Sequence, residues 1–138
     1  MEIIKGGISR DERGQIRFVN EFDMDNIKRF YIIKNIDCNT LRGWRAHRIE
    51  KRWFYAVSGV LKIAVVRIDN WKTPSKDLPI KQFFLNSEKS DVLYVPEGYG
   101  TLIQAMEENS EVIVFADHNI DHAKYDDHVY STDCFINL

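Results

Sequence analysis

Cysteine, long apolar runs and excess charge of one sign are all scarce in this sequence. The two cysteines, Cys38 and Cys134, lie far apart and in no ligand-type spacing, so we expect two reduced thiols in a cytoplasmic protein. The apolar runs are too short to cross a bilayer, and the first residues, MEIIKGGISRDERG, lack the apolar core of a signal peptide. A net charge of −2 gives no broad basic surface for nucleic acid.

The size and composition of the chain are those of one globular domain. It has 138 residues, of which 44% are hydrophobic and 29% charged. A chain of this length can bury one hydrophobic core, and its composition is not that of a disordered protein. No repeat or low-complexity tract divides it, so we expect a single domain over residues 1–138.

Short apolar segments with strand character recur along most of the chain. Strands are expected at residues 16–22, 30–36, 53–57, 60–68, 80–85, 92–95, 101–106 and 111–116. Ser58 and Gly59 are expected to form a tight hairpin turn between the third and fourth of these strands. One weak helical turn is expected at 121–127, and residues 69–79 form a long polar loop. This pattern predicts an all-β sandwich or barrel.

A dense group of basic residues surrounds one histidine between positions 42 and 52. This segment carries a formal charge of +4, although the whole chain is acidic. A positive focus on a negative body suits small anions better than long polyanions. Arginine matches phosphate oxygens with two parallel donors, and a carboxylate or a sulfated sugar would fit as well. Arg45 and His47 are two positions apart, so on a strand they would share one face.

Two segments of the chain resemble the paired motifs of the cupin superfamily in order and spacing. The first runs from the triplet Arg45-Ala46-His47 through Arg52 to Gly59, and the second is PEGYGT at 96–101. The resemblance covers about residues 14–135. It implies a small double-stranded β-helix, the cupin jelly roll, which agrees with the strand pattern.

Within the cupins, the segment LRGWRAH at 41–47 looks like the RGxHAH segment of the dTDP-sugar 3,4-ketoisomerases. Its opening positions also resemble the RGxH segment of the dTDP-4-dehydrorhamnose 3,5-epimerases, and residues 116–118 with 125–127 are similar to the closing segment of the ketoisomerases. The resemblance implies metal-free proton transfer beside the ketone of a dTDP-4-keto-6-deoxy sugar, in the biosynthesis of surface polysaccharides. It also implies a homodimer that exchanges N-terminal strands, which would cover the apolar segment 16–22.

The chain departs from the cupin pattern at four of its defining positions. Arg45 replaces the first histidine, which is the general base in the epimerases that this segment resembles. Arg52 stands at the glutamate position of the metal-binding cupins, Thr101 at the later histidine position and Ala105 at the asparagine position. Because a guanidinium offers no lone pair, we expect neither a metal nor another cofactor.

The basic residues and the histidine each allow more than one interpretation. Arg42, Arg45 and Arg52 either bind an anionic ligand or form buried ion pairs with carboxylates such as Glu50 or Glu107. His47 transfers a proton, donates a hydrogen bond to a ligand, or is a core histidine.

Aromatic and polar residues near the two motifs are weaker candidates for the site. Trp44 or Tyr31 could stack on a nucleotide base, or belong to the core. Tyr99 could act as an acid or contact the sugar, although turn chemistry also explains its segment. Gln104 is expected to point inward from its strand. We expect the tail to be solvated, including the histidines and aspartates at 117, 118, 121, 122, 126, 127 and 128.

Two functions of different classes follow from these residues. The first is a nucleotide-sugar 3,4-ketoisomerase in which His47 carries one proton between adjacent carbons. An epimerase is less favoured, because it needs a second group on the opposite face of the sugar. The alternative is a catalytically degenerate cupin that binds an anionic sugar or nucleotide sugar without turnover, through the arginines at 42, 45 and 52.

Overall fold

Two antiparallel five-stranded sheets make up most of the protein. The computed structural model describes all residues, 1–138. Its elements in chain order are β1 (Glu2–Ile4), β2 (Gly7–Asp11), β3 (Gly14–Phe18), β4 (Arg29–Ile33), β5 (Arg42–His47), β6 (Arg52–Ser58), β7 (Val60–Arg67), β8 (Ile80–Asn86), β9 (Val92–Val95), β10 (Tyr99–Ala105), β11 (Glu111–Ala116), α1 (Ile120–Ala123) and β12 (His128–Val129).

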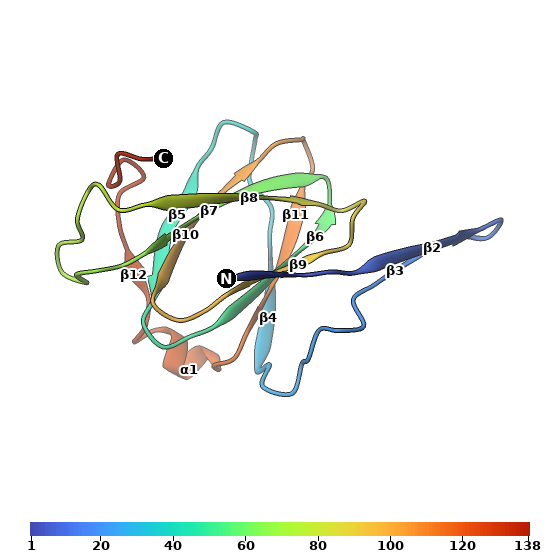
Figure 1. Cartoon of the computed structure of the whole chain (residues 1–138), viewed down its shortest axis with the longest axis horizontal. Coiled ribbons are helices and arrows are strands. Elements are labelled where there is room, and N and C mark those ends of the chain that lie inside the picture. The colour runs from blue at the N-terminus through green and yellow to red at the C-terminus, as the bar shows by residue number, and fades with distance from the viewer.

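The strand order in the two sheets is that of a jelly roll. One sheet has the order β1-β9-β6-β11-β4 and the other has the order β12-β5-β10-β7-β8. Strands β2 and β3 pair only with each other and form an arm that projects from the body (Figure 1). The expected all-β fold is therefore confirmed.

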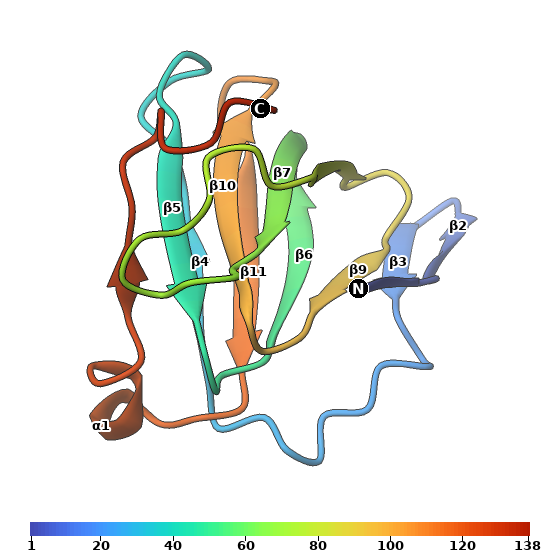
Figure 2. The ribbon, with the colours of Figure 1, turned by 60° about the vertical axis from the view of Figure 1, so that its left-hand side comes forward.

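Each face of the second sheet has its own hydrophobic cluster. Eleven buried side chains, among them Phe54, Ile63 and Leu93, fill the space between the sheets. Seven more, including Trp44 and Phe135, lie on the outer face of the second sheet. The loop from β7 to β8 crosses in front of this sheet, and the C-terminal segment runs along it (Figure 2). The long polar loop therefore covers a core layer.

The observed strands agree with most of the expected ones. Strands β9 and β11 have the expected bounds, and most of the other expected strands are shifted by one to three residues. Strands β1, β2, β5 and β12 have no counterpart among the expected strands, and the helical turn is present as α1. Neither cysteine forms a disulfide. The structure contains no helix long and apolar enough to cross a membrane.

The expected hairpin at Ser58-Gly59 is wrong. β6 and β7 belong to different sheets, so these two residues form a corner at which the chain crosses from one sheet to the other. Gly59 has φ +70°, and a Cβ there would lie 2.1 Å from Ser110 Oγ. The same hydroxyl accepts the Val60 N–H at 3.1 Å. The sequence pattern shows where such a turn lies but not whether the flanking strands pair.

Candidate functional site

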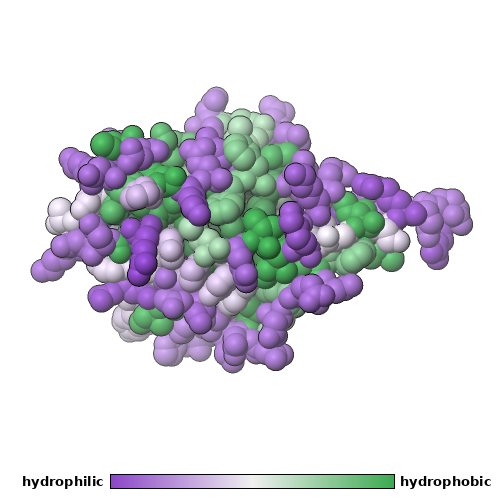
Figure 3. All heavy atoms as spheres, viewed as in Figure 1, coloured by the Kyte–Doolittle hydropathy of each residue, from purple (hydrophilic) through white to green (hydrophobic).

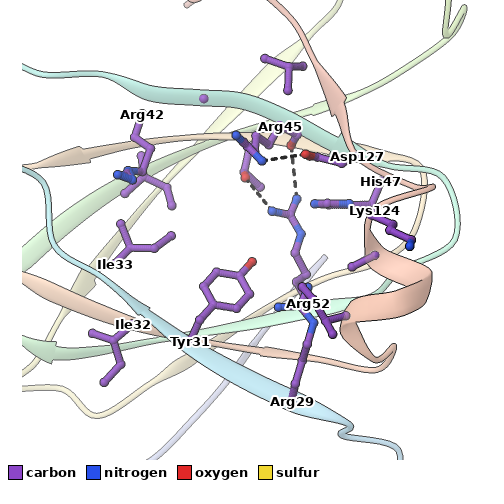
Figure 4. Close-up of a pocket in the computed structure, with 16 residues that line it drawn as sticks. Arg29, Tyr31, Ile32, Ile33, Arg42, Arg45, His47, Arg52, Lys124 and Asp127 are labelled. Atoms are coloured by element: carbon purple, nitrogen blue, oxygen red, sulfur yellow. Dashed lines mark hydrogen bonds and ion pairs between the residues drawn. The ribbon is translucent and has the colours of Figure 1, made fainter.

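A cavity of about 720 Å³ opens between the two sheets beside α1. Five cationic side chains and one carboxylate line it (Figure 4). The cations are Arg29, Arg42, Arg45, Arg52 and Lys124, and the carboxylate is Asp127. A cavity with this excess of positive charge favours an anionic ligand.

A bulge in β5 brings Arg42 and Arg45 to the same face. Thr101 of β10 pairs with Arg45, and Ile103 pairs with Arg42, so the register shifts by one residue between them. Such a bulge lets residues three apart point the same way. Gly43 supports it, because its φ is +139° and a Cβ there would lie 2.5 Å from Thr101 O. Both arginines consequently line the cavity.

His47 is a buried, neutral histidine with one free ring nitrogen. Its Nδ1 lies 2.7 Å from the carbonyl oxygen of Asp126. A carbonyl only accepts, so Nδ1 carries the proton and Nε2 keeps its lone pair. Burial, together with the charge of Arg52, lowers the pKa of His47 to about 4. At neutral pH the ring is therefore an unprotonated base at the cavity wall.

Asp126 organises the turn between β5 and β6. The residue is 6% exposed. The carboxylate accepts backbone N–H groups from Arg48 at 2.8 Å, Ile49 at 3.0 Å and Glu50 at 2.8 Å. The expectation of a solvated tail is wrong here, because this residue fixes both the turn and the ring of His47.

Glu50 forms a buried ion pair, but with an arginine that the sequence did not single out. Arg29 Nη2 lies 3.2 Å from Glu50 Oε1. Oε2 of Glu50 lies 3.7 Å from Nδ1 of His47 and has no hydrogen-bond partner. Burial raises the pKa of Glu50 and outweighs the opposing charges of Arg29 and Arg52. The carboxylate therefore lies near Nδ1 of the histidine.

Arg52 is a buried cation that makes no ion pair within salt-bridge distance. Its guanidinium donates to Thr101 Oγ1 at 3.1 Å and to the carbonyl of Arg45 at 3.5 Å. Burial lowers the pKa of Arg52, against opposing contributions from Tyr31 and Glu50. The position that holds a glutamate in metal-binding cupins thus presents donors to the cavity.

The other cationic side chains of the cavity differ in how they are paired. Arg45 Nη1 lies 2.7 Å from Asp127 Oδ2, and both side chains are partly exposed. Arg42 and Lys124 have no carboxylate within salt-bridge distance. No group of three or more histidine, cysteine, aspartate or glutamate side chains gathers anywhere to hold a metal.

Three of the expected site residues do not line the cavity. Trp44 is 0% exposed and packs edge-on against Phe135, with 5.2 Å between ring centroids, so its stacking role is wrong. Gln104 lies on the outer face of β10 and donates to the carbonyl of Cys38, so the expected inward orientation is wrong. Tyr99 lines a second, shallower hollow instead.

The cavity also contains residues that sequence reasoning missed. Arg29, Lys124 and Asp127 come from β4 and from the segment after α1, far from the arginine-rich segment. Tyr31, considered only as a stacking residue, also lines it. The tail that resembles the ketoisomerases was the one signal for Asp127. Arg42, Arg45, His47 and Arg52 are brought together as expected.

Solved structures share this fold over most of the chain. The 3,4-ketoisomerase QdtA from Thermoanaerobacterium thermosaccharolyticum, a mutant in complex with TDP-4-keto-6-deoxyglucose, has a TM-score of 0.70 and 23% identity, over 91% of this chain and 84% of QdtA. A dTDP-4-dehydrorhamnose 3,5-epimerase from Sulfolobus tokodaii has a TM-score of 0.77 and 20% identity, over 96% of this chain and 78% of the epimerase. The RmlC epimerase from Mycobacterium tuberculosis has a TM-score of 0.75 and 17% identity, over 94% of this chain and 68% of the epimerase.

A family model places the chain more specifically than these structures do. None of the curated proteins matches the chain. The model of the FdtA family, described as WxcM-like, C-terminal, matches residues 1–138. The chain, with its cation-lined jelly-roll cavity, therefore belongs to the FdtA family.

Proposed function

We propose that this protein is a metal-independent 3,4-ketoisomerase of a dTDP-4-keto-6-deoxy sugar, in a pathway of surface polysaccharide biosynthesis. The observation that carries the proposal is His47, whose Nδ1 is bonded to the Asp126 carbonyl while Nε2 remains free in a cavity lined by cations. Solved proteins of the same fold include ketoisomerases with TDP-sugar ligands. With one imidazole and one carboxylate on its wall, the cavity offers too few ligands for a divalent metal.

In the proposed reaction, His47 moves a proton between two adjacent sugar carbons. Nε2 takes the proton from C3, beside the C4 ketone, and the electron pair passes onto the C4 oxygen as an enolate. After the hydroxyl proton has moved from the C3 oxygen to the C4 oxygen, the imidazolium returns its proton to C4. The ketone is then at C3, with all atoms and electrons retained.

Guanidinium groups stabilise the enolate in this scheme. Arg52 is buried and has no paired carboxylate, and its hydrogen bonds to Thr101 Oγ1 and to the Arg45 carbonyl leave other N–H groups to donate to a developing oxyanion. Arg42 and Lys124, also without carboxylate partners, are available for the diphosphate. A fully buried cation acts in a low dielectric, where its effect on an anion is larger than in water.

A second function, binding without turnover, is favoured by one specific observation. Arg45 stands where the related segment has a histidine, and it pairs with Asp127 rather than offering a base. With a single histidine in the cavity, the protein could hold a nucleotide sugar and leave it unchanged. Both functions predict that a nucleotide sugar binds, but only the first predicts a new product.

Calorimetry followed by NMR separates the two functions. Calorimetry with dTDP and with dTDP-4-keto-6-deoxyglucose measures binding, and NMR of the incubated sugar detects a 3-keto product. Binding with product formation supports the isomerase, whereas binding alone supports the second function. If neither compound binds, both functions are wrong.

We further propose that the protein acts as a cytoplasmic homodimer that exchanges its N-terminal arm. The β2–β3 hairpin projects from the body, and Ile16 and Phe18 on it are 66% and 39% exposed. Its tip is hydrophilic, and hydrophobic side chains gather toward its base (Figure 3). The unpaired Cys38 and Cys134 fit a reducing compartment. Light scattering should give twice the monomer mass, and Ile16→Lys should lower it; a monomeric wild type would exclude the dimer.

A further inference from the structure

A 3,4-ketoisomerisation requires two proton movements, and His47 accounts for one of them. It transfers the proton between carbons, but a hydroxyl proton must also pass from the C3 oxygen to the C4 oxygen. While Nε2 of His47 holds the proton taken from C3, it has no lone pair left to accept the hydroxyl proton. A second group with a lone pair is therefore needed on the cavity wall, if the reaction is the one proposed above.

Asp127 is the carboxylate on that wall. Its Oδ2 bonds to Arg45 Nη1 at 2.7 Å, and its Oδ1 makes no hydrogen bond within the protein. The ion pair leaves one oxygen of a fixed carboxylate free to accept. Figure 4 shows Asp127 between Arg45 and His47.

The backbone holds Asp127 in a fixed relation to the histidine. The carbonyl of Asp126, the preceding residue, accepts a hydrogen bond from the His47 ring at 2.7 Å. The carboxylate of Asp126 accepts backbone N–H groups from the turn that follows His47. On the other side, Val129 pairs with Arg45 in the ladder between β12 and β5. Asp127 is thus tied at both ends to the strand that carries Arg45 and His47.

We propose that Asp127 is a catalytic residue that transfers the hydroxyl proton of the enolate. The carboxylate accepts the proton from the C3 oxygen and donates it to the C4 oxyanion. The C3 oxygen then holds the negative charge, which becomes the C3 carbonyl when C4 takes the proton from His47. Asp127 ends the cycle ionised, and Arg45 stabilises that ionised form.

The hydroxyl of Tyr31 is the competing group. Tyr31 also lines the cavity, but its phenol offers an O–H donor where Asp127 offers a carboxylate oxygen. It is suited to donate to the enolate oxygen rather than to collect a proton. Its removal should slow both proton movements together, because both pass through the enolate.

The test measures the two proton movements separately in Asp127→Asn. The sugar nucleotide dTDP-4-keto-6-deoxyglucose is incubated in D₂O, where deuterium at C3 reports His47 and the 3-keto product reports the complete reaction. We expect product formation to fall by at least about 100-fold, while exchange at C3 falls less than about fivefold. Asp121→Asn, an exposed aspartate in α1 that does not line the cavity, is the matched control.

Each outcome decides the proposal. Equal losses of exchange and product in Asp127→Asn, or no loss of either, would overturn it, and a selective loss of product in Tyr31→Phe would assign the step to the phenol. Asp127→Glu should restore part of the product if proton transfer is the role, and none if only packing matters. A wild type that binds the sugar without exchange or product refutes the proposed function itself, and with it this step.

Discussion

Replacing Asp126 by alanine should destabilise the protein more than the same replacement at an exposed aspartate does. Its carboxylate accepts three backbone N–H groups of the turn after β5, and the residue is 6% exposed. Hydrogen bonds to a charged group contribute about 1.5–3 kcal/mol each. Water can replace the acceptor at the part-buried N–H groups of Arg48 and Ile49, but the N–H of Glu50 is buried. We therefore expect a loss of about 3–4 kcal/mol in the free energy of unfolding.

Urea denaturation followed by circular dichroism measures this loss. Asp127→Ala is the matched control, since its ion pair with Arg45 joins side chains that are 32% and 58% exposed. Such a pair contributes about 1 kcal/mol or less. The reasoning is refuted if Asp126→Ala loses no more stability than Asp127→Ala, because the carboxylate would then not hold the turn.

Three other properties can be tested with single substitutions. Burial and Arg52 lower the pKa of His47 to about 4 from 6.5, so the unfolded chain takes up a proton that the folded one does not. In urea titrations of the wild type, the unfolding free energy should fall by about 3 kcal/mol as the pH drops from about 6.5 to about 4. His47→Gln should lack this pH-dependent loss, and equal slopes of unfolding free energy against pH in the two proteins would contradict it. Arg42→Ala should weaken dTDP binding by about 10–100-fold in calorimetry, whereas Arg67→Ala, outside the cavity, should not; equal effects would exclude a direct contact. Gly59→Ala should lower the unfolding free energy by about 2–4 kcal/mol, since its Cβ would meet a side chain 2.1 Å away at φ +70°, and an unchanged midpoint would show that the corner relaxes.

The site residues that are close together in the sequence could be predicted from the sequence. The arginine-rich segment around His47 was treated as one candidate site, and Arg42, Arg45, His47 and Arg52 line a single cavity. A simple alternation would have put Arg42 and Arg45 on opposite faces. The bulge at Gly43 places them together, and glycine was its only sequence signal.

The rest of the site depends on contacts that no local pattern contains. Trp44 was a candidate both for stacking on the ligand and for the core, and strand alternation turns it into the outer core layer. Arg29 reaches the cavity from a position 13 residues before Arg42, the first residue of the basic segment. Asp127 reaches it from 75 residues after Arg52, the last residue of that segment. Only the folded chain shows that the acidic tail holds His47.

The corner at Ser58-Gly59 illustrates the same limit for the fold. A two-residue connection between apolar strands predicts a hairpin from local chemistry. Here each strand buries a face against the opposite sheet, and the side chain of Ser110 satisfies the backbone at the corner. The packing of two sheets therefore decides the connection.

Deuterium exchange next to the ketone, catalysed by the wild type and by His47→Gln, tests the central claim most directly. The substrate is dTDP-4-keto-6-deoxyglucose in D₂O, observed by NMR. With the wild type we predict deuterium at C3 of the unreacted 4-keto sugar and a 3-keto product. With His47→Gln we predict neither, although this variant should still bind dTDP because the cations of the cavity remain. Exchange or product formation that persists in His47→Gln, or a wild type that binds the sugar but neither exchanges C3 nor forms product, would contradict the assignment of His47 as the base.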